Sequence, residues 1–213
     1  MTETPVPAQS RAEPSGTVYV VDDDEAVRDS LRFLLEASGY SVEAFDSAES
    51  FLSGFDTDAL ACLILDVRMP GASGLQLQDE LARRGVGLPI VFITGHGDVP
   101  MAVATMKKGA ADFIQKPFDQ TALKALVGRL LVQARSEAEE KQRKRMNAQR
   151  IAQLTARELE VLGRISAGRL NKQIAGDLGI SIKTVEAHRA NIMAKLQANT
   201  VADLMRVVLQ AEG

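Results

Sequence analysis

Five short runs of β-branched and other apolar residues alternate with longer amphipathic stretches between residues 17 and 134. This alternation is typical of a parallel sheet whose strands are connected by helices that cover both faces. We expect strands over residues 17–21, 41–44, 61–65, 90–94 and 112–115, and helices over residues 25–38, 48–55, 75–84, 99–108 and 119–134. The sequence therefore predicts an α/β domain with a doubly wound, five-stranded parallel sheet.

The strand pattern stops after residue 134. Residues 135–150 are charged and have almost no apolar side chains, so we expect a solvated linker that is helical or frayed. Beyond it, residues 155–167, 171–178, 181–197 and 200–211 show helical periodicity, and Thr155 and Glu158 have the spacing of a capping box. We expect a disordered tail over 1–15, the α/β domain over 16–134, the linker over 135–150 and an all-α four-helix domain over 151–213.

The cysteine count and the lack of long apolar runs limit the class of protein. A single cysteine, Cys62, excludes an intrachain disulfide, and with only two histidines it cannot complete a Cys/His zinc site. The first sixteen residues have no apolar stretch of signal-peptide length, and no run of about 18 apolar residues occurs. We therefore expect a cytoplasmic protein that is neither secreted nor membrane-spanning.

Charge is distributed unevenly along the chain. Residues 1–134 carry 11 basic and 19 acidic side chains, a net charge of −8, whereas residues 135–150 carry a net +3 and residues 151–213 a net +2. The excess of basic residues at the C-terminal end is small. It is compatible with random surface charge and also with a part of the chain that binds a polyanion.

Carboxylates follow two of the predicted strands. Asp22, Asp23 and Asp24 come directly after the first strand, and Asp66 comes directly after the third. The carboxyl ends of parallel strands meet at one edge of the sheet, so these side chains should converge there. Like charges about 4 Å apart repel by roughly 4 kcal/mol at an effective dielectric near 20, which favours a bound cation, and Mg²⁺ suits such a set. Acidic capping of the helix near residue 25 is an alternative explanation for Asp23 or Asp24.

Two more residues complete a set suited to a phosphoryl group. Thr94 ends the fourth predicted strand, and Lys116 follows the fifth, immediately before Pro117. A carboxylate nucleophile, a metal, a hydroxyl donor and an ammonium are the groups that phosphoryl transfer requires. Each residue taken alone is unremarkable at a strand end, so the hypothesis depends on their combination.

The segments VYVVDDDEAVRDSL, LILDVRMPG, FITGH and DFIQKPF occur in this order and resemble the flavodoxin-like receiver domain of two-component response regulators. The resemblance implies that Asp66 accepts phosphate from a sensor histidine kinase. It implies that Mg²⁺ is held by Asp22, Asp23, Asp66 and the main-chain carbonyl of Arg68. It further implies that Lys116 binds a phosphoryl oxygen through a cis peptide to Pro117. Thr94 and Phe113 would be the switch residues, with Phe113 in a position where many members have tyrosine.

The helical segment has the signature of a helix-turn-helix. The stretch 171–178 is followed by Gly179, Ile180 and then Ser181, a residue suited to cap the next helix. On that helix Val185, His188, Ile192 and Leu196 share one stripe, which we expect to be buried. The opposite face carries small and polar side chains that are able to approach base edges: Lys183, Glu186, Ala187, Ala190, Asn191 and Ala194. Lys172, Arg189 and Lys195 are candidates for phosphate contacts, and an ordinary solvent-exposed polar face is the alternative.

The stretch LTARELEVLGRISAGRLNKQIAGDLGISIKTVEAHRANIMAKLQA is similar to the LuxR/NarL-type DNA-binding domain. Together with GHGDVPMAVATMKKGA, it makes the whole chain similar to response regulators of the FixJ type. The resemblance implies a transcriptional regulator that dimerises on phosphorylation, binds double-stranded promoter DNA and acts on RNA polymerase, with the last helix as the dimer contact on DNA. The implied DNA-binding residues are Lys172, Lys183, Thr184, Glu186, Ala187, Arg189, Ala190, Asn191 and Lys195.

Two alternative functions share part of this pattern. A phosphatase or mutase of the haloacid dehalogenase type also uses a strand-end aspartate and Mg²⁺, but it needs a second aspartate two positions on, where this chain has Arg68. A DNA-binding regulator whose receiver acts without phosphorylation is the other. We therefore expect no turnover enzyme, apart from catalysis of the chain's own aspartyl phosphorylation and dephosphorylation.

Overall fold

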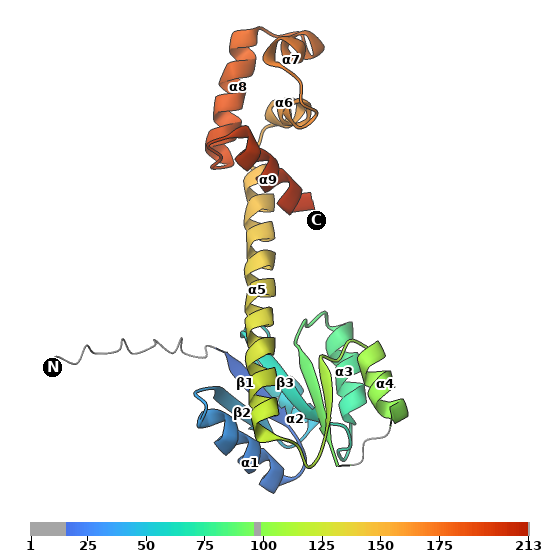
Figure 1. Ribbon diagram of the computed structural model, residues 1–213. Coiled ribbons are helices and arrows are strands. Elements are labelled where there is room, and N and C mark those ends of the chain that lie inside the picture. The colour runs from blue at the N-terminus through green and yellow to red at the C-terminus, as the bar shows by residue number, and fades with distance from the viewer. Residues whose placement is uncertain (1–15, 96–98, 213) are drawn as a thin grey trace, which may run out of the picture. The chain divides into compact units, whose positions relative to one another are not determined.

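The computed structural model describes residues 16–95 and 99–212 (Figure 1). The chain divides into two compact units, the first ending at Ser136 and the second beginning at Glu137. The tail predicted over residues 1–15 lies outside the described residues.

The first unit contains a five-stranded parallel sheet with the strand order β2-β1-β3-β4-β5. The predicted fold class is therefore confirmed. The strands are β1 (Thr17–Val21), β2 (Ser41–Phe45), β3 (Ala61–Asp66), β4 (Ile90–Thr94) and β5 (Asp112–Gln115). Three match the predicted bounds, while β2 and β3 each extend one residue further. The order reverses direction between β1 and β3, and in such sheets ligands bind outside the carboxyl ends of the strands at this point.

Helices cover both faces of this sheet (Figure 1). They are α1 (Glu25–Glu36), α2 (Ala48–Gly54), α3 (Gly74–Arg83), α4 (Val99–Lys107) and α5 (Gln120–Ala152). Alternate residues of β1 enter different cores: Val18 and Val20 pack with α1 and α5, whereas Tyr19 and Val21 pack with α2 and α3. Because β1, β3 and β4 are buried on both faces, their runs are almost continuously apolar, whereas the edge strands β2 and β5 are partly exposed and include polar residues.

Side-chain caps fix where the helices next to the carboxyl edge begin. Asp24 accepts a hydrogen bond from the amide of Ala26 and so starts α1 directly after the acidic run. Ser73 accepts from the amide of Gln76 at the start of α3. These caps supply acceptors for amides that have no partner within the helix, and they set the short connections that follow β1 and β3.

Helix α5 does not end near residue 134, as the apolar pattern suggested, but continues to Ala152, so the linker predicted over residues 135–150 is helical and not frayed. Ion pairs four residues apart accompany this stretch, Glu139 with Arg143 and Glu140 with Lys144. Such pairs support an exposed helix by a few tenths of a kcal/mol each. The stretch is almost wholly exposed as far as Met146, whereas Asn147 is buried.

The second unit packs four further helices on the end of α5: α6 (Ala156–Ser166), α7 (Asn171–Leu178), α8 (Ile182–Lys195) and α9 (Val201–Glu212). Its core includes Val161, Ile174, Val185, Ile192 and Leu204. The capping box of Thr155 and Glu158 is present as predicted. Helix α7 ends at Leu178 and is capped by Gly179, whose φ of 63° is a left-handed conformation that glycine adopts without strain.

Cys62 is a buried free thiol in β3, and burial raises its pKa to about 12. Within residues 16–95 and 99–212, none of the helices has the length and apolar character needed to cross a membrane.

Candidate functional site

The carboxyl edge of the sheet gathers polar side chains that are almost completely buried. Asp22 follows β1 and is 3% exposed, Asp66 ends β3 and is 7% exposed, and Thr94 ends β4 and is 1% exposed. Lys116 comes from the segment that follows β5, and its amide donates to the carbonyl of Thr94 at 2.8 Å. The four strand-end residues predicted for this edge are thus brought to it.

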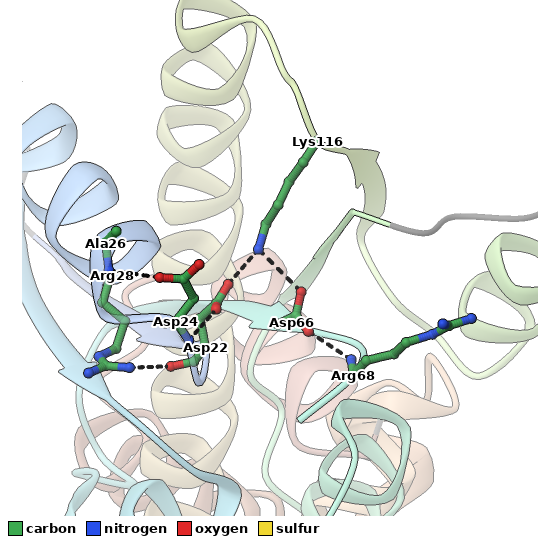
Figure 2. A network of polar contacts seen from close by, with 7 residues as sticks. All are labelled: Asp22, Asp24, Ala26, Arg28, Asp66, Arg68 and Lys116. Atoms are coloured by element: carbon green, nitrogen blue, oxygen red, sulfur yellow. Dashed lines mark hydrogen bonds and ion pairs between the residues drawn. The ribbon is translucent and has the colours of Figure 1, made fainter. Parts of the chain in front are cut away.

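Lys116 reaches between the two buried carboxylates (Figure 2). Its Nζ lies 2.7 Å from Oδ2 of Asp22 and 3.3 Å from Oδ1 of Asp66. The remaining oxygens are held by the main chain, since the amide of Asp24 donates to Asp22 Oδ1 at 3.0 Å and the amide of Arg68 donates to Asp66 Oδ2 at 2.8 Å. The carboxylates are therefore fixed in position by charge-assisted hydrogen bonds.

Electrostatics distinguish Asp66 from an ordinary surface carboxylate. Burial raises its pKa, and the neighbouring charge of Asp22 acts in the same direction, whereas the amide of Arg68 and the ammonium of Lys116 partly offset the rise. Burial alone would lower the pKa of Lys116, but its hydrogen bonds and charge interactions with Asp22 and Asp66 outweigh this effect and raise it. Perturbed pairs of this kind are typical of functional sites.

The peptide from Lys116 to Pro117 is cis, as the family resemblance implied. Phe113 in β5 is partly buried and packs against the core that contains Phe92. It lies two strands away from β3 in the sheet order, next to β4, the strand that ends at Thr94.

The residues expected to bind a metal differ in their exposure. Asp23 is exposed, and Arg68 contributes an amide contact to Asp66 while its side chain points to solvent. In the part of the chain that the structure describes, no group of three His, Cys, Asp or Glu side chains is close enough to hold a metal ion. The two carboxylates that do meet, Asp22 and Asp66, are hard oxygen donors and fit Mg²⁺, which needs only one or two carboxylates.

Two contributors to the site were missed by sequence reasoning. Arg28 in α1 donates from its guanidinium to the carbonyl of Asp22 at 2.8 Å. Gly74, the first residue of α3, lies so close to Asp66 that an added Cβ would be less than 3.0 Å from the Asp66 carbonyl oxygen. A glycine immediately after the capping residue Ser73 was the only available signal for this close approach.

The second candidate site is the exposed face of α8. The stripe predicted to be buried contains Val185, Ile192 and Leu196, which are fully buried, and His188, which is partly buried. Ser181 caps the helix by accepting from the amide of Thr184 at 3.0 Å. The residues predicted for the opposite face are all exposed: Lys183, Glu186, Ala187, Ala190, Asn191 and Ala194; Thr184, predicted to bind DNA, is exposed as well.

The three basic residues predicted to contact phosphate differ in their surroundings. Lys172 at the start of α7 is exposed, and Arg189 in α8 is partly exposed. Lys195, the last residue of α8, instead pairs with Glu158 in α6, with 2.7 Å between Nζ and Oε2. Because Glu158 is only 3% exposed, Lys195 has a structural partner in this unit that the helical pattern did not reveal.

Both units match known protein families. The family described as the response regulator receiver domain matches residues 18–128, and the luxR family of bacterial regulatory proteins matches residues 152–208. The first unit has a buried aspartate and a partly buried lysine at the carboxyl edge of a doubly wound sheet, and the second has a helix-turn-helix. Together with these matches, they define a response regulator with a DNA-binding domain.

Relatives that match this chain along nearly their whole length show which type of response regulator it is. The chain is 48% identical to the transcriptional regulatory protein FixJ of Azorhizobium caulinodans, over 91% of this chain and 92% of the relative. It is 42% identical to FixJ of Bradyrhizobium diazoefficiens, over 92% and 96%. Among solved structures, response regulator StyR matches with a TM-score of 0.85 at 45% identity, covering 91% of this chain and 98% of that one. The chain belongs to the FixJ-type response regulators, which are transcriptional regulators of two-component systems.

Proposed function

We propose that Asp66 accepts a phosphoryl group from the phosphohistidine of a sensor kinase. The observation that carries the proposal is the ammonium of Lys116, held between the buried carboxylates of Asp22 and Asp66. In the transfer, an Asp66 carboxylate oxygen forms a bond to phosphorus while the bond from phosphorus to the histidine nitrogen breaks, and the imidazole leaves. Lys116 binds an oxygen of the transferred group and offsets the charge of nearly −2 that the phosphate brings.

Asp22, Asp23, Asp66 and the carbonyl of Arg68 would hold Mg²⁺. The bound ion supplies charge neutralisation for the phosphoryl oxygens. The buried pair of Asp22 and Asp66 supports this assignment, because these two carboxylates share the single positive charge of Lys116. Asp23 lies at the exposed rim and is the weakest member of the set.

Thr94 and Phe113 would transmit the change to the surface formed by α4, β5 and α5. Phe113 has no hydroxyl, so ring packing alone carries its part of the switch. Reversing a population from 1:99 to 99:1 needs about 5.5 kcal/mol of differential stabilisation. The rearranged surface would form a homodimer, which binds promoter DNA through α8 and acts on RNA polymerase. We place this function in the cytoplasm, where the free thiol of Cys62 stays reduced.

The phosphoacceptor is tested with acetyl phosphate and Mg²⁺. Asp66→Ala should abolish formation of an acid-stable, base-labile acyl phosphate. Asp24→Asn is the matched control, since asparagine caps a helix as well as aspartate does and the labelling should persist. Labelling that survives in Asp66→Ala would place the phosphoacceptor elsewhere, and would favour a receiver that acts without phosphorylation of Asp66.

Dimerisation and the DNA contacts have separate tests. Phosphorylation should increase the dimer fraction in equilibrium sedimentation, and identical association before and after would contradict this step. Lys183→Ala should weaken binding to a selected operator more than binding to random DNA, because base contacts carry the sequence information. Equal losses on the two DNAs would remove Lys183 from the groove.

A further inference from the structure

The last turns of α5 are built into the helical unit. Asn147 is 6% exposed, and its amide nitrogen donates to Oε1 of Gln210 in α9 at 3.2 Å. One turn further on, the guanidinium of Arg150 donates to Oε1 of Gln197 at 2.7 Å. Gln197 lies two residues after the end of α8 and has a φ of 54°, which is uncommon for a residue with a side chain. The end of α5 thus holds the turn in which α8 ends.

A second contact holds the same end of α8. The Nζ of Lys195 donates to Oε2 of Glu158 at 2.7 Å and to the carbonyl of Gln153 at 3.3 Å. That oxygen of Glu158 also accepts from the amide and the hydroxyl of Thr155, at 2.8 and 3.0 Å. One carboxylate therefore joins the end of α8 to the start of α6 and to the segment that leaves α5.

Because Glu158 is buried, it is costly for Lys195 to leave this carboxylate and bind a DNA phosphate instead. A buried carboxylate that loses its partner is left with an uncompensated charge, which is much more costly than the loss of a surface ion pair. A DNA phosphate would have to draw the ammonium of Lys195 away from this carboxylate. The exposed Lys172 has no such cost, because its side chain lies in solvent.

We propose that Lys195 is a positioning residue of the DNA-binding unit and not a phosphate contact. Through Glu158, and together with the pair of Arg150 and Gln197, it fixes the direction of α8 relative to the last turns of α5. This inference rests on the proposed binding of DNA by α8. It revises the phosphate-binding role that the helical pattern suggested for Lys195.

The test compares Lys195→Met with Lys172→Met in the full-length protein. Methionine keeps most of the aliphatic stem and removes the charge. The probes are a duplex selected by the protein from a randomised library and a random-sequence duplex, each titrated over a range of salt concentrations. A lost phosphate contact lowers the slope of log affinity against log salt by about 0.9 and weakens both duplexes alike. We expect this result for Lys172→Met.

Lys195→Met should give the opposite pattern. We expect affinity for the selected duplex to fall about tenfold, the scale of one lost charge-assisted hydrogen bond, with a smaller effect on the random duplex and an unchanged salt slope. The selectivity between the two duplexes therefore falls, whereas a loss of folded protein would lower both affinities equally. Lys195→Arg should restore the selectivity.

A double-mutant cycle with Glu158→Gln makes the proposal refutable even where Lys195→Met folds poorly. Glutamine still accepts from the amide of Thr155, so Glu158→Gln alone should reproduce the loss of selectivity, and adding Lys195→Met to it should cost little more. A salt slope lowered by about 0.9 in Lys195→Met, or unchanged selectivity in Glu158→Gln, would overturn the proposal. If the parent protein selected no duplex at all, the failure would lie in the proposed binding of DNA by α8.

Discussion

Gly74→Ala tests how closely α3 is packed against the phosphoacceptor strand. Gly74 begins α3, and its amide donates to the carbonyl of Val67 at 3.1 Å. A Cβ at this position would meet the carbonyl oxygen of Asp66 at less than 3.0 Å and would lie 3.1 Å from Cγ of Leu65. Because the first contact is with the backbone of a central strand, a rotation of a side chain cannot relieve it.

Two opposing effects determine how much Gly74→Ala changes the free energy of unfolding. Replacing glycine by alanine in a helix normally stabilises it by about 0.5–1 kcal/mol, with less effect at the first position. Overpacking of a well-filled core costs about 1–3 kcal/mol. The clash should prevail, with a net loss of about 1–2 kcal/mol in the free energy of unfolding of the first unit. Displacement of Asp66 by several tenths of an ångström should also slow its phosphorylation about tenfold, since a 1 Å misplacement costs about 100-fold.

Gly163→Ala is the matched control. Gly163 is an exposed residue inside α6, and among the described residues nothing lies within 4 Å of a Cβ added there. The same methyl group should therefore stabilise the second unit by about 0.5–1 kcal/mol. Urea unfolding followed by circular dichroism, and the initial rate with acetyl phosphate and Mg²⁺, measure both variants. A Gly74→Ala protein as stable as the parent, with an unchanged rate, would refute the reasoning.

The sheet was predictable from the sequence because its three central strands are buried on both faces and all five strands are separated by recognisable turns. The continuation of α5 was predicted only as one of two alternatives, a linker that is helical or frayed, because apolar periodicity reports only the face of a helix that packs on a core. The exposed residues 135–146 have no such face, yet they continue the helix with good helix formers and ion pairs. Asn147, whose partner is 63 residues away, marks the return to a packed surface.

In the candidate sites, too, one set of contacts was predictable from the sequence and another was not. The approach of Asp22, Asp66 and Lys116 was predicted because the topology of a parallel sheet brings strand ends together. The partner of Lys195 was not predicted, because spacing on one helix does not reveal which side chains a different helix presents. The sequence pattern indicates only a local capping role for Glu158, whereas in the structure it both caps α6 and pairs with Lys195 of α8.

Three further predictions concern groups whose pKa the fold changes. Lys116→Met should raise the pKa of Asp66 further, because about 4 kcal/mol of repulsion between close carboxylates is no longer offset; an unchanged titration of Asp66 by NMR would contradict this. Burial raises the pKa of Cys62 to about 12, so this thiol should resist a maleimide in the native protein and react once urea unfolds the chain. Labelling of the native protein would instead show that β3 opens. The hydrogen bond from Lys195, aided by that from Thr155, lowers the pKa of Glu158 from an ordinary 4.5 to about 2. A carboxyl group with a lowered pKa in the folded state stabilises that state fully above pH 4.5, and this contribution is lost as the pH falls towards 2. The unfolding free energy of the second unit should therefore decline over this interval, and less steeply in Glu158→Gln, which has no carboxylate to protonate. Equal slopes in the two proteins would mean that the pair of Glu158 and Lys195 does not stabilise the fold.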